Sequence, residues 1–370
     1  MEESVLKNAK PRILFILHLP PPVHGASMMG RQIQESAVVS ASCQASFINL
    51  SASSTLREIG RRPWQKAAFV IRLLREVRRE LRRCKPDLVY VTPTSTLPGF
   101  IKDYLVVRLV RKAGVRVVVH FHNKGVSSRQ DRWLDDRLYR SFFKGTDVIL
   151  LSRSLYPDVR KYVPENRLHI CPNGIPDLPH VRVEHTGFRF LFLSNLIPTK
   201  GILVLLEACR VLKEKGRRFQ CEFVGAGTVG MEADKFVEII RSMGLEGMVV
   251  YSGPCYGEEK VKALARSDAF VFPTFYPYEC FPLVLLEALS MELPVITTRE
   301  GAIQDIVEDG VDGILCQQQD LSGLVRAMEY LLDHPDKARE MGSKGRERFL
   351  GQFTSRCFES NLLSILQKLI

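Results

Sequence analysis

The 370-residue chain lacks the features that mark several classes of protein. It contains no run of the roughly 18 apolar residues that a membrane-spanning helix needs. Its nine cysteines are scattered, with no Cys-x-x-Cys pair and no Cys/His cluster at zinc spacing. It also has no low-complexity segment and no short-period repeat. These absences argue against a helical membrane protein, a zinc-binding module and a repeat protein.

Targeting signals of the secretory type are also missing. Residues 1–7 have no apolar core, and the apolar run at 13–19 is short and ends in three prolines, so we expect a strand there. Scattered cysteines are usually buried and reduced, as in proteins of the cytoplasm. The sequence therefore predicts a cytoplasmic protein.

No Asp-x-Asp dyad occurs on a loop that follows a predicted strand. Asp135 and Asp136 fall in a helical segment, and Asp309 and Asp312 flank a turn. We therefore predict that the protein uses no catalytic metal.

The composition is that of a soluble globular protein, with 45% apolar and 25% charged residues, and the length suffices for two domains. The net charge of +11 is shared unevenly. Residues 1–180 carry 30 Lys+Arg against 15 Asp+Glu, whereas residues 181–370 carry 22 against 26. This asymmetry suggests that the first half faces an anionic partner.

Strand-like and helix-like segments alternate along nearly the whole chain, in two successive series. Such alternation predicts an α/β protein with two doubly wound, Rossmann-like domains of parallel strands. The predicted strands are 12–17, 45–50, 88–91, 115–121, 148–151 and 167–170, then 188–193, 220–224, 248–251, 269–272, 294–298 and 313–316. In the first series the predicted helices are 27–39, 65–84, 101–113 and 131–145.

The boundary between the two series lies within residues 171–180, where three prolines and a glycine interrupt regular structure. We expect domains at 1–175 and 176–350. The remaining residues, 351–370, are apolar at helical spacing from 355 onward and predict a terminal helix.

Two carboxylates stand out in the second half. Glu279 follows a strand-like run ending at Pro273, and Glu287 lies eight positions later inside a helix-like run. Ligands of open α/β sheets bind where strands end and helices begin. Carboxylates there can accept hydrogen bonds from sugar hydroxyls, and the helix start between them can hold phosphate. The arrangement suits a nucleotide-sugar.

With Phe281-Pro282-Leu283 after the first Glu and Ala288-Leu289 after the second, the segment resembles the E-x7-E motif of retaining glycosyltransferases of the GT-B fold, family 4. The resemblance extends over most of the chain. It implies two Rossmann-like domains that face each other across a cleft, a terminal helix that returns to the first domain, and no cofactor besides a nucleoside-diphosphate-sugar donor. It also implies a glycan or glycolipid acceptor.

Under this resemblance, Glu287 would hold the ribose, Glu279 the transferred sugar, and the backbone at Phe281 and Leu283 the phosphate. Lys200, at a strand-to-helix junction, would bind the diphosphate. The family carries a second basic residue shortly before this lysine, where this chain has Asn195. Either another cation replaces it or Asn195 acts as a neutral donor.

In the first domain, the family's glycine-rich turn corresponds to Gly25, with His24 beside it. A glycine there lets the backbone approach a ligand closely. The alternative is an ordinary helix start capped near Ser27. The family's histidine that orients the sugar matches His122, with His120 as the alternate, and alternation places both on one face of their strand. Both could instead be structural.

The run from Gly225 to Gly230 fits the G-x-G-x-x-G dinucleotide fingerprint. However, a complete strand–helix unit precedes it, and no carboxylate ends the next strand. We interpret Gly225 as part of a loop beside the nucleotide rather than as an NAD site. After the next strand, the loop with Pro254 and Tyr256 matches the family's base-contacting loop.

Residues 57–85 form a basic segment, and its middle has apolar residues at helical spacing with arginines on the other face. Such a helix can lie on an anionic membrane surface, which would make the protein peripheral on the inner face of the cell membrane. The alternatives are a solvated helix face and a nucleic-acid stripe. We predict no nucleic acid, because no aromatic residues are interleaved.

The sequence therefore predicts a glycosyltransferase. A sugar-nucleotide epimerase or phosphorylase, a binding protein without turnover, and an NAD oxidoreductase stay as alternatives.

Overall fold

A computed structural model describes the chain except at residues 1–9, 22, 52–62, 180 and 182. Residues 57–62 of the predicted basic segment and residue 180 of the predicted boundary therefore lie outside the described residues. The chain divides into two compact units. One comprises Met1–Asn173 and Phe358–Ile370, and the other comprises Gly174–Cys357.

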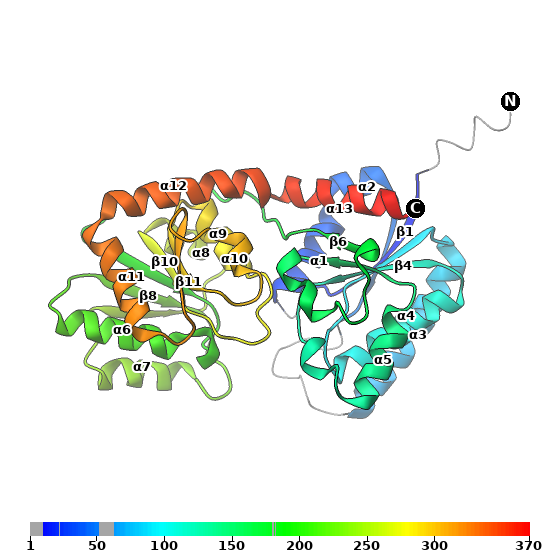
Figure 1. Ribbon diagram of the computed structural model, residues 1–370, viewed down its shortest axis with the longest axis horizontal. Coiled ribbons are helices and arrows are strands. Elements are labelled where there is room, and N and C mark those ends of the chain that lie inside the picture. The colour runs from blue at the N-terminus through cyan, green and yellow to red at the C-terminus, as the bar shows by residue number, and fades with distance from the viewer. Residues whose placement is uncertain (1–9, 22, 52–62, 180, 182) are drawn as a thin grey trace. The chain divides into compact units, whose positions relative to one another are not determined.

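The N-terminal unit is built on a parallel six-stranded sheet with the order β2-β1-β3-β4-β5-β6 (Figure 1). Most of its strands are apolar on both faces because helices cover both sides. The strands are β1 (Arg12–Leu17), β2 (Gln44–Asn49), β3 (Leu88–Val91), β4 (Arg116–Phe121), β5 (Asp147–Leu150) and β6 (Leu168–Ile170).

Helices follow these strands as right-handed crossovers. Across the sheet, the connection from β1 to β2 runs in one direction, and the connections from β2 to β3, β4 and β5 run in the opposite direction. Because right-handed crossovers in opposite directions lie on opposite faces, α1 and α2 cover one face of the sheet and α3, α4 and α5 cover the other. Their bounds are α1 (Gly25–Glu35), α2 (Ala37–Ser42), α3 (Pro63–Cys84), α4 (Gly99–Lys112) and α5 (Trp133–Phe143). The helix predicted at 27–39 is two helices, because the Ser36 side chain accepts from the Val39 amide and starts a new one.

The C-terminal unit repeats this design with the order β12-β11-β10-β7-β8-β9, again all parallel. Its strands are β7 (Arg189–Leu193), β8 (Gln220–Val224), β9 (Val249–Gly253), β10 (Ala269–Phe272), β11 (Val295–Thr298) and β12 (Gly313–Cys316). Its helices are α6 (Ile202–Glu214), α7 (Ala233–Ser242), α8 (Gly257–Ala265), α9 (Leu283–Ser290), α10 (Ile303–Ile306), α11 (Leu321–Asp333) and α12 (Pro335–Gln352).

The end of the chain differs in detail from the prediction of a terminal helix over 351–370. Helix α12 continues to Gln352, and the residues after it stay with the C-terminal unit: Phe353 packs against Phe281, and the Ser355 amide donates to the Ile175 carbonyl. Helix α13 (Ser355–Leu369) then enters the N-terminal unit, where the Leu369 carbonyl accepts from Arg116. None of the helices in the described part of the chain is long and apolar enough to cross a bilayer.

Candidate active site

The candidate residues of the C-terminal unit come together at the edge of the sheet where the parallel strands end. Lys200 ends a short 3-10 turn, Pro198–Lys200, that follows β7. Glu279 lies in the loop after β10, the neighbour of β7 in the sheet. Glu287 lies on α9, which begins four residues after Glu279. Lys200 and Glu279, which are 79 positions apart in the sequence, are thereby brought together.

Lys200 and Glu279 form an ion pair, in which the Lys200 ammonium donates to Oε2 of Glu279. Only 13% and 9% of their side chains are exposed. The Thr274 hydroxyl lies 3.5 Å from the same carboxylate oxygen, and the Tyr276 ring centroid lies 4.7 Å from the ammonium. Charges this poorly hydrated need a partner, and in this pair each side chain supplies one for the other.

Gly201 explains why the lysine loop can pack so closely on the glutamate loop. Its φ is +87°, and a Cβ at this position would lie 2.2 Å from the Pro273 carbonyl oxygen. The Phe275 amide also donates to the Thr199 carbonyl at 2.8 Å. Only glycine allows this approach without a shift of the backbone.

Glu287 pairs with a second lysine. Oε1 accepts from the Lys260 ammonium of α8 at 2.5 Å, and only 12% of the Glu287 side chain is exposed. Burial raises the pKa of Glu287, and Lys260 opposes this rise. Oε2 is buried without a hydrogen-bond partner among the described residues. A buried carboxylate oxygen in this condition is an acceptor for a ligand hydroxyl.

The start of α9 presents backbone rather than side-chain groups. Pro282 is the N-cap residue and offers no side-chain cap, and Leu283 is the first helical residue. The Phe281 side chain is buried against Phe353, with ring centroids 5.9 Å apart. Any contact of Phe281 with a ligand would therefore use its backbone.

Asn195, Gly225 and the loop after β9 form one connected group. A Cβ on Gly225 would lie 1.8 Å from the Ser194 carbonyl oxygen, so this glycine allows the loop after β8 to touch the loop after β7. The Gly225 amide donates to the Gly253 carbonyl at 2.9 Å, and the Tyr251 hydroxyl donates to the Gly225 carbonyl at 2.8 Å. Beyond Gly253, Pro254 and Tyr256 are exposed.

The glycine run does not lead directly into a helix. Thr228 and Met231 pair with each other as an antiparallel bridge, and α7 begins only at Ala233. The strand after it, β9, ends in Ser252-Gly253. The geometry differs from that of the dinucleotide fingerprint, in which the last glycine opens the helix.

The two histidines of β4 and its end are neighbours in the N-terminal unit, as their alternation predicts, with ring centroids 4.3 Å apart. His120 is fully buried, and its Nδ1 lies 2.7 Å from the Tyr90 hydroxyl. Burial holds the pKa of His120 well below its usual range. Burial also lowers the pKa of His122 to about 4, against hydrogen bonding by Asn173. His120 is fully buried, whereas the His122 side chain is partly exposed, although both of its ring nitrogens are buried.

His24 has a structural task that the sequence assigned to Ser27. Its Nδ1 accepts from the Ser27 amide at 3.2 Å, while the Ser27 hydroxyl accepts from the His24 amide at 3.0 Å, a capping box at the start of α1. Gly25 is the first residue of α1 and is exposed, with open space where a Cβ would stand.

Sequence reasoning missed several residues of these two groups. Thr274, Tyr276 and Lys260 in the C-terminal unit, and Tyr90 and Asn173 in the N-terminal unit, carry no motif. Of these residues, only Thr274 could have been found from the sequence, because it is a polar residue directly after a buried strand.

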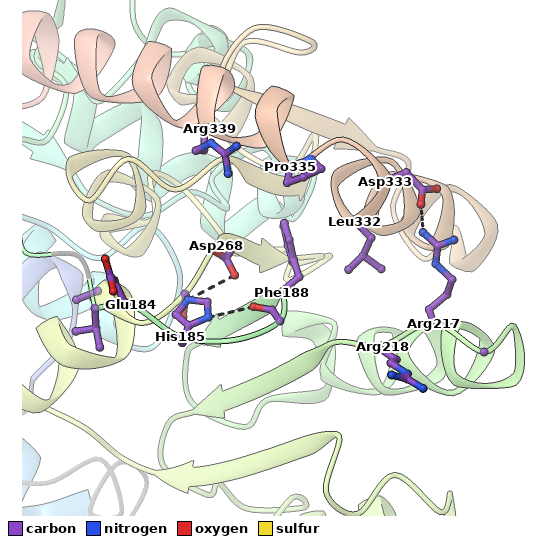
Figure 2. A pocket seen from close by; sticks show the side chains of 15 residues that line it. Glu184, His185, Phe188, Arg217, Arg218, Asp268, Leu332, Asp333, Pro335 and Arg339 are labelled. Atoms are coloured by element: carbon purple, nitrogen blue, oxygen red, sulfur yellow. Dashed lines mark hydrogen bonds and ion pairs between the residues drawn. The ribbon is translucent and has the colours of Figure 1, made fainter.

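A hollow of about 920 Å³ lies elsewhere in the C-terminal unit, at the opposite edge of its sheet (Figure 2). Its lining includes residues that precede strands: Phe188 before β7, Arg217 and Arg218 before β8, and Asp268 before β10. In this hollow His185 contacts Asp268, and Arg217 pairs with Asp333 (Figure 2). It contains none of the candidate residues and is separate from the candidate site.

Comparison with known proteins identifies the class as a glycosyltransferase of the GT-B fold. The model of the glycosyl transferases group 1 matches residues 179–348, and that of glycosyltransferase family 4 matches residues 41–194. The N-acetyl-alpha-D-glucosaminyl L-malate synthase of Bacillus anthracis is 31% identical over 273 residues, which are 70% of this chain and 69% of that protein. The chain belongs to the group 1, family 4 glycosyltransferases.

Other relatives are also glycosyltransferases. The amylovoran biosynthesis glycosyltransferase AmsK of Erwinia amylovora is 25% identical over 266 residues, covering 69% of this chain and 64% of AmsK. The chain spans about two thirds of the length of such curated relatives. The fold matches Anabaena HepE, whose structure was solved with UDP-glucose, with a TM-score of 0.74 and 17% identity over 96% of this chain and 99% of HepE.

Proposed function

We propose that the protein transfers a sugar from a nucleoside-diphosphate-sugar to an acceptor hydroxyl with retention of the anomeric configuration. The observation that carries this proposal is a set of charged side chains that follow neighbouring parallel strands: Lys200 paired with Glu279, and Glu287, on the helix after them, paired with Lys260. It supplies a cation for a diphosphate and two carboxylates for hydroxyls, beside a helix start whose amides are not capped by a side chain.

Each group has a role in this reaction. Lys200 offsets the charge that develops on the leaving diphosphate, together with the backbone at Phe281 and Leu283. Glu287 accepts from the ribose through its free Oε2. Glu279 binds the transferred sugar, and donor binding must then share the Lys200 ammonium between Glu279 and phosphate.

The loops around this group would hold the nucleoside. Tyr256 and Pro254 are exposed after β9, and Gly225 allows the neighbouring loops after β7 and β8 to pack closely beside them. Asn195 would act as a neutral donor where relatives carry a cation. Lys260 is a second ammonium among the described residues of this unit that contacts a candidate residue, and it is bound to Glu287.

In the N-terminal unit, His122 would orient the sugar as a neutral imidazole, since its pKa of about 4 leaves it uncharged at neutral pH. The oxocarbenium-like state of such a transfer is stabilised largely by electrostatics and positioning. No metal and no further cofactor is part of the proposal.

The acceptor would be a glycan or a lipid-linked precursor of a cell-surface polysaccharide. Relatives named for amylovoran biosynthesis, for D-rhamnosyl transfer in Pseudomonas aeruginosa and for O-antigen mannosyl transfer in Escherichia coli support this class. The basic helix α3 would lie on the anionic inner face of the cell membrane, where such lipid acceptors are found.

Donor hydrolysis tests the catalytic part of the proposal. The purified protein is incubated with a panel of UDP- and GDP-sugars without acceptor, and released nucleotide is measured. Thermal shift with the same panel finds the donor, because a ligand that binds the folded state raises the melting temperature. We expect release for one donor and loss of release in Glu279→Ala and in the isosteric Glu279→Gln. Binding without release for every donor would support a binding protein instead.

A further inference from the structure

Both tryptophans of this chain are exposed. The sequence contains two, Trp64 and Trp133, and their exposed fractions are 68% and 74%. Tryptophan is a mostly buried residue in globular proteins, and it is enriched on the surface where one end of the ring meets an apolar medium. Two exposed tryptophans in one unit therefore call for a partner.

Trp64 and Trp133 lie near the starts of two helices on the same face of the N-terminal sheet. Trp64 is the second residue of α3, and Trp133 and Leu134, also exposed, are the first two residues of α5. Helix α4 packs against both α3 and α5 and exposes Ile101, its third residue (Figure 1). Because each helix follows a parallel strand, all three begin at the edge where the strands end.

Unpaired cations cover the rest of this face. The outward side of α3 exposes arginines that make no ion pair with any described residue: Arg72, Arg75, Arg78 and Arg82. A shallow hollow of about 410 Å³ on α3 is lined by arginines alone, namely Arg75, Arg78, Arg79, Arg82 and Arg83. Such a hollow fits phosphate groups, which guanidinium groups bind with two parallel hydrogen bonds.

The two carboxylates next to Trp133 within α5 are paired, whereas Asp131 before it is 91% exposed and lies 3.9 Å from the Lys161 ammonium. Asp135 is buried and accepts from Arg129 at 2.7 Å. Asp136 accepts from Arg140 at 2.7 Å and from the Tyr162 hydroxyl at 2.8 Å. These bonds fix the start of α5 as a rigid platform, while the Arg137 guanidinium stays over the Trp133 ring, 6.0 Å from its centroid.

We propose that the starts of α3, α4 and α5, together with the arginine face of α3, form one docking surface for an anionic phospholipid bilayer, with Trp133 and Leu134 entering the headgroup layer. This deepens the membrane part of the proposed function and rests on it. Exposed apolar residues beside cations are the pattern of an interfacial anchor. Base stacking is disfavoured as an alternative, because Leu134 and Ile101 are aliphatic and cannot stack on bases as aromatic rings do.

The surface would hold the acceptor side of the enzyme at the bilayer. His122 follows β4 at the same edge of the sheet at which α3, α4 and α5 begin. A lipid-linked acceptor could then reach His122 without leaving the membrane.

Tryptophan fluorescence tests the docking directly. In Trp64→Phe, Trp133 is the remaining tryptophan and reports its own surroundings. Vesicles of phosphatidylglycerol with phosphatidylcholine should shift its emission to the blue, and brominated lipid should quench it, whereas pure phosphatidylcholine vesicles should do neither. If the full-length wild type floats with anionic vesicles but Trp133 shows neither change, the insertion of α5 is wrong.

Two sets of variants separate the charges from the apolar anchor. Replacing Arg72, Arg75, Arg78 and Arg82 by Gln should lower the vesicle partition coefficient more than tenfold, since each basic residue near an anionic surface adds to the attraction. Replacing Arg241, Lys337, Arg339 and Lys344 of the C-terminal unit by Gln removes the same charge and should change it less than twofold.

The pair Trp133→Ser and Leu134→Ser should lower the partition coefficient about tenfold, and Leu350→Ser, an equally exposed apolar site in the C-terminal unit, should leave it unchanged. Loss with the arginine variants alone would overturn the α5 anchor and keep α3 on the membrane. Equal loss with both charge sets would overturn a specific surface. Stronger binding of a single-stranded oligonucleotide than of vesicles would identify a nucleic-acid face instead. Donor hydrolysis without vesicles should persist in all these variants, so failure here leaves the transfer reaction untouched.

Discussion

Glu287 gives one carboxylate oxygen to Lys260, 2.5 Å away, and its other oxygen is buried without a partner among the described residues. The carboxylate is therefore held in position from one side and open to a ligand on the other. Burial raises its pKa, and Lys260 is the group that limits this rise. The ribose-binding role proposed for Glu287 thus depends on a lysine in a different helix.

Lys260→Met should raise the pKa of Glu287 further. A protonated Glu287 accepts hydroxyl hydrogen bonds less well, so the acidic limb of the kcat/KM profile for the donor should move to higher pH, and KM should rise more than kcat falls. Lys262→Met on the same helix is the control, because Lys262 pairs only with the exposed Glu259. Profiles that coincide for the wild type and Lys260→Met would contradict the coupling.

The Lys200–Glu279 pair should behave as one unit in stability. Removing one partner strands the other charge in a site with little solvent, which typically costs about 3–5 kcal/mol. We expect Lys200→Met and Glu279→Gln each to lower the free energy of unfolding, and the double variant to lose clearly less than the two losses combined. Urea unfolding of the four proteins measures this coupling. Glu214→Gln, in an exposed pair with Arg210, is the control and should have little effect.

Gly201→Ala should lower turnover on the order of 100-fold by moving the lysine. The added Cβ would meet the Pro273 carbonyl oxygen at 2.2 Å, so the backbone that carries Lys200 must shift, and a displacement of about 1 Å can cost on the order of 100-fold in rate. Gly216→Ala separates this clash from backbone strain, since Gly216 also has a positive φ, +74°, but open space around it. Equal activity of the two variants would show that the close approach has no role.

The sequence predicted the parallel sheets and the placement of Lys200, Glu279 and Glu287 because these depend on local signals: apolar runs, punctuation by glycine and proline, and polar residues directly after strands. It could not predict Lys260, because a partner on a different helix leaves no periodic mark, and it overlooked Thr274 although a polar residue just after a strand is such a signal. It also placed the arginines of α3 on one face but did not distinguish Arg79, which lies beside Glu80, from the unpaired Arg78. Whether such an ion pair forms depends on where the ends of the two side chains lie, and a helical wheel does not show this.

The histidines of the N-terminal unit predict how stability depends on acid. The pKa of His122 is lowered from 6.5 to about 4 in the folded protein, so the unfolded chain binds more protons than the folded one between these values. The contribution of His122 to the free energy of unfolding is therefore fully present above about pH 6.5. It is lost as the pH falls toward 4, by up to about 3 kcal/mol.

His122→Asn should therefore remove part of the pH dependence of unfolding in this window. Urea titrations across it measure the slope for wild type and variant, and imidazole NMR signals follow each histidine directly. His334→Asn, on the exposed surface of the C-terminal unit, serves as the control and should keep the wild-type slope. Tyr90→Phe removes the phenol that faces His120 Nδ1 and should alter the titration of both histidines, because their rings are in contact. If His122 titrates near its ordinary pKa in the folded wild type, its proposed role as a neutral imidazole is wrong.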